Sequence, residues 1–261
     1  MLALVCATPS VTPSRVHLID AYPRSSPHNF LFRGNNPVTD KTFNLTELVA
    51  VLRQQASTEC GATLPESFRF IDLDLENPTD PGYLVELHFW KQHANLGSAE
   101  VWPTLGSAIE FKHTPAIVRK KLIANGSWAV EGHADYLPER LNQTRALLLD
   151  TNGPPTVMYV HCNAGCDRTG EFIASYALSH LGYNITTAYG EACKQCGRCP
   201  NYYATQAIGW WCLTLQEQGR ADIGDCLDFE GCQVLGDCDA HHPTPLADAC
   251  PRAQAQLVES S

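Results

Sequence analysis

The spacing of apolar side chains predicts that strands and helices alternate along the chain. Residues 68–75 alternate apolar and polar side chains, and residues 156–160 form a short β-branched and apolar run, which are the patterns of strands. Residues 137–150 place leucines on one helical face, and apolar residues recur at helical spacing from Thr169 onward. A helix, a turn, a strand, a loop and a second helix in this order are typical of an α/β core.

Signals at the ends of elements place the other helices and strands. Asn44 and Glu47 form a capping box ahead of an apolar stripe, and Asp135 suits the N-cap of the helix before the 156–160 strand. Gly182 is the expected C-cap of the helix that starts at Thr169. Further strands are expected over residues 16–20 and from Phe30 into a turn at residues 34–37, and further helices over residues 185–193 and 202–216.

The loop after the 156–160 strand carries the candidate chemistry. It reads His161-Cys162-Asn163-Ala164-Gly165-Cys166-Asp167-Arg168-Thr169-Gly170. The first N–H groups of a helix lack carbonyl partners and the helix dipole adds positive charge, so this position stabilises an anion. A cysteine there, close to an arginine, is stabilised as a nucleophilic thiolate, and the Arg168 guanidinium can bind two phosphate oxygens at once. The loop predicts a phosphate site above Cys162; the alternative is a buried cysteine in an ordinary strand-to-helix turn.

His161-Cys162, five residues, and Arg168-Thr169 resemble the signature of the cysteine-dependent protein tyrosine and dual-specificity phosphatase superfamily, including its lipid phosphatase branches. The resemblance implies hydrolysis of phosphate monoesters, with Cys162 as nucleophile, Arg168 as phosphate ligand and Thr169 easing departure of the thiolate. No metal or other cofactor is expected, because the loop amides and Arg168 supply the positive charge. The other loop residues expected to contact the substrate phosphate are His161, Asn163, Ala164, Gly165, Cys166 and Gly170.

Two aspartates are candidates for the acid that protonates the leaving group. In related phosphatases this acid lies on a mobile loop upstream of the cysteine, where this chain has Asp135, with Glu131 or His133 as substitutes and a simple helix cap as the alternative role. Asp167 directly precedes Arg168, which is similar to myotubularin and Sac-type phosphoinositide phosphatases, where that residue has been assigned an acid role. Its alternative is an ion pair with Arg168 or another basic neighbour. We expect a direct role for Asp167, and the choice of acid stays open.

Charge limits the partners. The chain has 28 acidic and 18 basic residues, a net charge of −10, which argues against nucleic acid or an anionic membrane surface as the main partner. No run of about 18 apolar residues predicts a transmembrane helix. The loop has no lysine and carries Asp167, which favours a substrate with few phosphates, whereas the Cys-Asp-Arg-Thr string resembles lipid phosphatases. The substrate class therefore stays open between a phosphotyrosine or phosphoprotein and a phosphoinositide or inositol phosphate.

The cysteines have several possible states. The chain has 12 of them, and the spacing of Cys193, Cys196 and Cys199 permits disulfides, zinc or free thiols, with disulfides favoured. Zinc would need a fourth ligand from Cys212 or from His241 or His242. Cys166 permits a regulatory disulfide with the nucleophile, although a small packing residue is the favoured interpretation.

The cysteines and four Asn-x-Ser/Thr sequons favour a secreted or lumenal location over a cytoplasmic one. Residues 1–7 lack the basic start and the long apolar run of a signal peptide, which opposes this assignment. The sequons lie at Asn44, Asn125, Asn142 and Asn184.

The predicted fold class is α/β, with a central mixed sheet flanked by helices, as in dual-specificity phosphatases, and a cysteine-rich C-terminal extension. We place an N-terminal tail at residues 1–15, a phosphatase domain at 16–218 with an insertion within 83–131, and a cysteine-rich tail at 219–261. The basic residues 119–121 are read as a solvated helix face rather than as charge at the mouth of the pocket. Two other functions are open: a catalytically silent phosphate-binding module, and a secreted disulfide-rich interaction protein.

Overall fold

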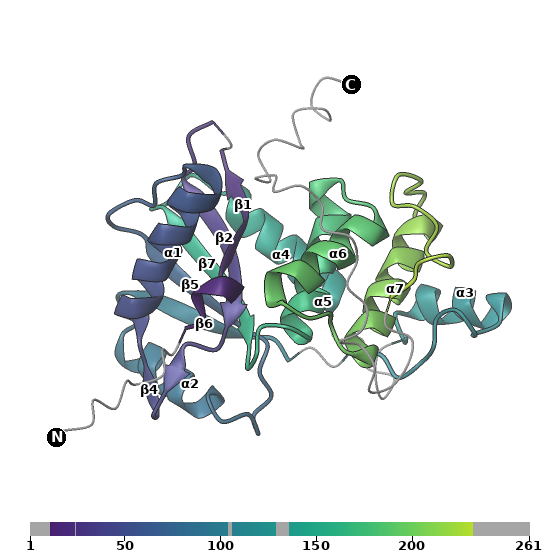
Figure 1. Ribbon diagram of the computed structural model, residues 1–261, viewed down its shortest axis with the longest axis horizontal. Coiled ribbons are helices and arrows are strands. Elements are labelled where there is room, and N and C mark those ends of the chain that lie inside the picture. Colours follow the sequence, from purple (N-terminus) through teal and green to yellow (C-terminus); the bar gives the residue numbers. More distant parts are fainter. Residues whose placement is uncertain (1–10, 24, 104–105, 129–135, 232–261) are drawn as a thin grey trace.

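The chain folds around a five-stranded mixed sheet (Figure 1). The computed structural model describes residues 11–23, 25–103, 106–128 and 136–231. In sheet order the strands are β1 (His17–Tyr22), β2 (Asn29–Asn35), β7 (Thr156–Cys162), β5 (Arg69–Asp74) and β6 (Gly97–Val101). β1 runs antiparallel to β2, whereas β2, β7, β5 and β6 are parallel neighbours. The carboxyl ends of these four strands meet at one edge of the sheet, the edge where α/β folds commonly bind ligands.

Helices cover both faces of the sheet (Figure 1). One face is covered by α1 (Leu45–Cys60) and α2 (Tyr83–Gln92), beside a small ribbon of β3 (Val38–Thr39) and β4 (Thr42–Phe43). The opposite face is covered by α4 (Leu137–Leu149), α5 (Arg168–Tyr176), α6 (Ile185–Cys196) and α7 (Tyr202–Glu217). The short elements are η1 (Pro13–Arg15), α3 (Ala116–Asn125), and η3 (Ala177–Leu181), a π-helical turn after α5.

β7 contributes side chains to the cores on both faces. Met158, Val160 and Cys162 belong to the core on the α4–α7 side, and Val157 and Tyr159 belong to the core on the α1 side. A central parallel strand buried on both faces reads as a continuous apolar run, which is why residues 156–160 were recognisable in the sequence.

The predicted fold class is confirmed: a central mixed sheet is flanked by helices, and the predicted strands and helices are present near their expected positions. Asn44 caps α1 as predicted, because its side chain accepts a hydrogen bond from the Glu47 backbone N–H at 3.1 Å and donates one to the Glu47 carboxylate at 3.0 Å. The Asn44 backbone N–H donates to the Pro37 carbonyl, so the second bond of a capping box is replaced by this contact. Gly182 ends the π-helical turn with a φ of 73°. Asp135, the expected cap of α4, lies outside the described residues.

The structure also bears on the domain boundaries. Residues 11–15 pack on the domain although the sequence placed them in a tail, because Val11 is fully buried and Arg15 reaches the phosphate loop. α2 and β6 are parts of the core, which confines the proposed insertion to residues after Val101. Beyond residue 218, Ile223 and Phe229 are buried, and residues 232–261 lie outside the described residues.

The predicted disulfides are present in the described part of the chain. Its disulfides are Cys166–Cys196, Cys193–Cys199 and Cys212–Cys226. Each cysteine that was considered as a zinc ligand is therefore part of a disulfide. His241, His242, Cys232, Cys238 and Cys250 lie outside the described residues. Within those residues, none of the helices has the length and apolar character needed to span a bilayer.

Candidate functional site

The predicted phosphate loop lies at the carboxyl edge of the sheet. Cys162 is the last residue of β7, and α5 begins at Arg168, so residues 163–167 connect a central strand to a helix N-terminus. Cys162 pairs in register with Asn35 of β2, is only 3% exposed and is a free cysteine. The nucleophile candidate therefore sits on a rigid strand beneath the loop.

The loop is held by its carbonyl groups. Arg15 donates to the Ala164 carbonyl at 3.0 Å, Arg33 donates to the Gly165 carbonyl, and the Asn36 N–H donates to the carbonyls of Cys162 and Asn163. In a planar trans peptide the N–H points opposite to the carbonyl of the preceding residue. The next N–H groups therefore point away from these donors, and among the described residues those of residues 163–167 have no hydrogen-bond partner. Unbonded N–H groups in a loop at the start of a helix can form an anion site.

Gly165 is required by the shape of this loop. Its φ is +71°, and an added Cβ would overlap the backbone carbonyl of Gly34. Gly34 is itself restricted, because its own Cβ would overlap the Tyr159 hydroxyl, which donates to the Asn35 carbonyl at 2.7 Å. β2 and the loop thus approach each other through two glycines.

Arg33 supports the loop from inside the protein. Its side chain is fully buried, and it also donates to the Gln195 side chain at 3.1 Å. Burial lowers the pKa of Arg33 to about 10, against the attraction of Cys162 and Tyr159. The sequence placed this residue only in a strand leading to a turn; its neighbourhood to Cys162 follows from the pairing of β2 with β7.

Arg168 faces the other side of the loop and is held by the segment that follows β5. It donates to the Leu75 carbonyl at 2.9 Å and to Asp80 at 2.5 Å, and Asp80 also accepts from the Asn77 N–H. Burial opposes the charge of Arg168, but the negative charges of Cys162, Asp80 and Glu76 outweigh it and raise its pKa. Asp80 was missed in the sequence; the available signal was the turn that follows the 68–75 strand.

Of the two aspartates predicted as the general acid, the structure describes only Asp167. Asp135 and its substitutes Glu131 and His133 lie outside the described residues. Asp167 forms a two-point ion pair with Arg198, each contact 2.7 Å long, and accepts from the Asn201 N–H at 2.8 Å. The structure thus shows for Asp167 the ion pair with a basic neighbour that was the alternative to a direct acid role.

The remaining loop residues are tied to their surroundings. Thr169 is fully buried, and its hydroxyl has no hydrogen-bond partner among the described residues. An added Cβ on Gly170 would come within 2.8 Å of the Pro200 ring. Cys166 is bonded to Cys196 rather than to Cys162, which differs from both roles expected for it.

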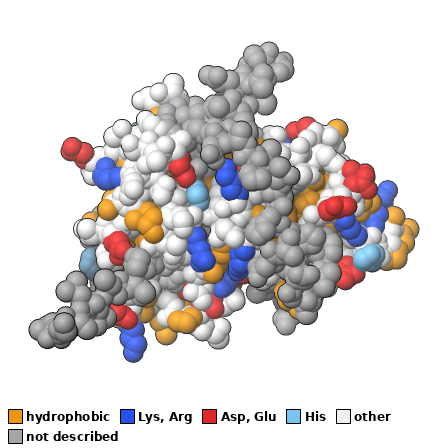
Figure 2. All heavy atoms as spheres, in the orientation of Figure 1, with side chains coloured by type: hydrophobic (Ala, Val, Ile, Leu, Met, Phe, Trp, Pro, Cys, Tyr) orange, Lys and Arg blue, Asp and Glu red, His pale blue; other side chains and the backbone are white. Residues whose placement is uncertain are grey.

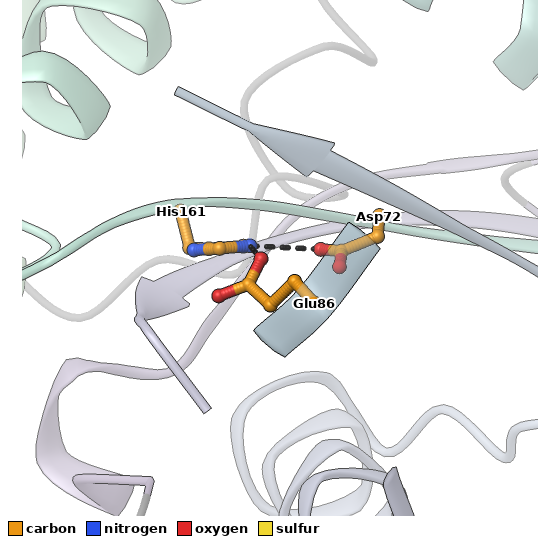
Figure 3. A group of neighbouring side chains, drawn as sticks. All are labelled: Asp72, Glu86 and His161. Atoms are coloured by element: carbon orange, nitrogen blue, oxygen red, sulfur yellow. Dashed lines mark hydrogen bonds and ion pairs between the residues drawn. The ribbon is translucent and has the colours of Figure 1, made fainter. Parts of the chain in front are cut away.

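His161 points toward the buried acidic side chains of Asp72 and Glu86, as Figure 3 shows. Its Nε2 lies 2.8 Å from Asp72 Oδ1 and 3.3 Å from Glu86 Oε2, and all three side chains are fully buried. The other Asp72 oxygen accepts from the Trp90 indole N–H at 2.7 Å. β5, β7 and α2 are therefore joined by ionisable side chains next to Cys162, the candidate nucleophile.

Burial controls the charges in this group. It raises the pKa of Glu86 to about 8 and that of Asp74 to about 6, although His161 opposes both shifts. Burial alone would lower the pKa of His161, but the charges of Glu86 and Asp72 outweigh it and raise that pKa well above its usual value. Near neutral pH, Glu86 therefore keeps its proton, and His161 is protonated as well.

Asp72, Glu86 and His161 also form the one described group whose ligand atoms, all within 4.8 Å of one another, could hold a metal ion. The Nδ1 atom of His161 has no hydrogen-bond partner among the described residues. A metal-bound histidine nearly always donates from its second nitrogen to an acceptor that fixes the ring. Within the described part of the chain, His161 lacks such an acceptor at Nδ1, and its Nε2 is hydrogen-bonded to Asp72. The group is therefore better described as an ion-pair network than as a metal centre.

The basic residues 119–121 belong to α3, which has no buried residue and lies at the periphery beside α7, away from β7 (Figure 1). Figure 2 shows other Lys and Arg side chains near the middle of the face in view. Positive charge at the loop itself comes from Arg15, Arg33 and Arg168, although the whole chain is acidic.

The comparisons with known proteins yield only distant structural likenesses. No protein-family model matches the chain, and no curated protein matches it. Among solved structures, the chain is similar to a mouse protein classed as a dual specificity phosphatase and complexed with zinc tungstate. The identity is 14% and the TM-score 0.39, over 84% of this chain and 96% of that one.

Two human structures show a similar level of likeness. DUSP28 has 13% identity and a TM-score of 0.36, over 76% of this chain and 95% of its own. The tyrosine phosphatase-like serine/threonine/tyrosine-interacting protein has 14% identity and a TM-score of 0.33, over 72% of this chain and 90% of its own. These values are too low to assign a family or an activity, so the function rests on the geometry of the site.

Replacing Gly165 by alanine should destabilise the protein by at least about 1–2 kcal/mol, because a left-handed residue with a side chain costs about that much before any overlap is counted. The added methyl group also meets the Gly34 carbonyl. Urea unfolding of Gly165→Ala would measure the loss. Gly153→Ala is the matched control, since a Cβ there meets nothing within 4 Å; equal effects of both substitutions would contradict the role given to Gly165.

The free energy of unfolding should fall as the pH rises from 4.5 to about 8, because folded Glu86 keeps a proton that the unfolded chain releases near 4.5. The raised pKa of His161 has the same sign: its stabilisation is complete at low pH and is lost as the pH rises. Glu86→Gln mimics the neutral carboxyl, so its free energy of unfolding should fall less as the pH rises. Above about pH 8, that free energy should exceed the wild-type value by about 1 kcal/mol or more.

Urea unfolding curves between about pH 5 and 8.5 would test this prediction. Asp72→Asn is the contrasting variant, because it removes a charged partner from a buried pair and should cost roughly 3–5 kcal/mol throughout that range. Parallel pH curves for wild type and Glu86→Gln would show that Glu86 does not titrate as described.

Proposed function

We propose that this protein is a cysteine-dependent phosphatase that hydrolyses phosphate monoesters through a cysteinyl-phosphate intermediate. The observation that carries this proposal is the loop between β7 and α5. Its carbonyls are bound by Arg15, Arg33 and the Asn36 N–H, which leaves the N–H groups of residues 163–167 unbonded among the described residues, above a free Cys162. A phosphoryl group matches the charge and geometry of such donors.

The proposed reaction has two displacements. The Cys162 sulfur attacks phosphorus, the bond from phosphorus to the ester oxygen breaks, and the leaving oxygen takes a proton from an acid. Water then attacks the cysteinyl phosphate and the sulfur–phosphorus bond breaks, which releases inorganic phosphate and restores the thiolate. The buried Thr169 hydroxyl, unbonded among the described residues, is available to stabilise that thiolate. Arg168 would exchange its bond to Asp80 for bonds to phosphate oxygens.

Three aspartates compete for the role of the acid. Asp135 remains a candidate from the sequence. Asp167 must first release Arg198 or Asn201 before either of its oxygens can donate a proton, which favours a positioning role. Asp80 is added by its contact with Arg168, the side chain proposed to bind the phosphate, because it would then lie near the leaving group.

The substrate class is proposed as phosphotyrosine or phosphoprotein, or a phosphoinositide or inositol phosphate. The loop itself does not separate these classes, because Arg198 neutralises Asp167. Asp167 is therefore a weaker argument against a substrate with several phosphates than the loop sequence alone suggests.

Cys162→Ser should abolish phosphate release from a panel of phosphotyrosine peptide, phosphoinositides and inositol phosphates, because serine lacks the stabilised thiolate. The measurement is phosphate release by the full chain, dialysed against a chelator. Asn152→Ala, in an exposed turn, is a control that should keep full activity. A fully active Cys162→Ser variant would overturn the proposed mechanism.

The acid can be identified with two substrates that differ only in the leaving group. Removing the acid should slow an alkyl phosphate strongly and an activated aryl phosphate little, because the activated oxygen leaves without a proton. The variants are Asp80→Asn, Asp135→Asn and Asp167→Asn. Equal losses on both substrates identify a positioning residue instead.

The two alternative functions predict other outcomes of the same assay. A catalytically silent phosphate-binding module would bind vanadate at Cys162 and release no phosphate from any substrate. A secreted disulfide-rich interaction protein would neither bind vanadate nor release phosphate, even with the Cys193–Cys199 and Cys212–Cys226 disulfides intact. A free Cys162 together with an intact Arg168 supports the enzyme, whereas only the assay separates it from a silent phosphate-binding module.

A further inference from the structure

The outer half of the phosphate loop is bound by one segment, residues 193–201, which we name the clamp. It comprises the end of α6, the turn after it and the residue before α7. The disulfide Cys193–Cys199 closes a short ring inside the clamp, and Cys196 within that ring is bonded to Cys166 of the loop. The loop is thus covalently tied to a segment that is itself cross-linked.

The clamp contacts consecutive residues of the loop. Gln195 accepts from Arg33, which in turn donates to the Gly165 carbonyl. The next residue, Cys166, forms the disulfide with Cys196. Asp167, which follows it, accepts hydrogen bonds from Arg198 and from the Asn201 N–H. Residues 165, 166 and 167 are therefore each held by the clamp, directly or through one side chain.

Pro200 extends these contacts to the start of α5. The ring packs so closely on Gly170 that an added Cβ would come within 2.8 Å of it. Because the helix begins at Arg168, the clamp limits movement on both sides of the arginine proposed to bind the phosphate.

We propose that the Cys166–Cys196 disulfide and the Asp167–Arg198 ion pair position the loop N–H groups and Arg168 for catalysis, so that the enzyme is fully active only in its oxidised form. This inference rests on the proposed phosphatase function. A reducing dithiol transfers two electrons and two protons to the disulfide, which leaves Cys166 and Cys196 as thiols, and the reductant itself becomes a disulfide. The loop then keeps only non-covalent contacts to the clamp.

The size of the effect follows from the geometry of catalysis. A misplacement of about 1 Å in reacting groups can lower a rate about 100-fold. We expect reduction to lower kcat about 10- to 100-fold. An active site that depends on a disulfide suits an oxidising compartment, where such bonds persist.

The first test compares two double variants of the full chain, each lacking one disulfide. Cys166→Ala with Cys196→Ala removes the bond to the loop, and Cys212→Ala with Cys226→Ala removes the one between α7 and the segment after it. The readouts are kcat and KM on an activated aryl phosphate, and the pH dependence of Cys162 alkylation by iodoacetamide, followed by mass spectrometry.

The loop variant should lose about 10- to 100-fold in kcat, with alkylation of Cys162 displaced to higher pH, because the loop charges no longer converge on the sulfur. Treating wild type with a phosphine reductant should reproduce both changes. The control variant should keep the kcat and the alkylation profile of wild type. A folded loop variant with kcat within about twofold of wild type and an unchanged alkylation profile would overturn the proposal.

A second test leaves every disulfide in place, so it holds even if the loop variant fails to fold. Asp167→Asn and Arg198→Gln should each lower kcat to a similar degree on good and poor leaving groups, and the double variant should lose little more than either. Additive losses would contradict the ion pair's role. If oxidised wild type releases no phosphate, the phosphatase proposal fails, while the alkylation profile still reports whether the clamp shapes the environment of Cys162.

Discussion

The loop depends on a buried cation. A guanidinium inside a protein is unstable unless its charge and its donors are compensated. Arg33 meets this condition through its hydrogen bonds to the Gly165 carbonyl and the Gln195 side chain. The same residue thus fixes the peptide that turns the loop and faces the sulfur that must carry charge in the proposed reaction. Removing it would leave the loop without its internal support and Cys162 with one neighbouring cation fewer, because Arg168 would remain.

β7 connects this arrangement to a second charged group. Successive side chains of a strand point to opposite faces, so His161 and Cys162 enter different layers. Cys162 belongs to the α4–α7 side, whereas His161 meets Asp72 and Glu86 on the side of α2 (Figure 3). The ion-pair network holds three elements together where β7 ends, and it does so without taking part in the proposed chemistry. The carboxyl edge of the sheet is therefore rigid beneath the loop on both faces.

The elements were predictable because their signals are local. The Asn44 capping box and the alternation over residues 68–75 each lie within a few positions, and the phosphate loop is one contiguous string. The supports of the loop are distant in sequence: Arg33 reaches Gly165 across 132 residues, and Arg168 reaches Asp80 across 88. Such contacts follow from strand order, which a single sequence does not contain, and disulfide connectivity is equally inaccessible. Asp72 and Asp74, two acidic residues at alternate positions of a buried strand, are a local signal that this strand has buried polar partners.

The contacts of the clamp with Asp167 change how this acidic residue of the loop is interpreted. An aspartate next to the phosphate arginine suggests repulsion of a phosphorylated substrate when the string is read alone, and it suggests an acid when compared with lipid phosphatases. Its two-point pair with Arg198 removes most of the repulsion and commits both oxygens. These contacts favour the proposed positioning role for Asp167, in which it holds the start of the helix against a cross-linked segment and another carboxylate supplies the proton. Asp80 is the candidate that we add for that role, because it already contacts Arg168 beside the same loop.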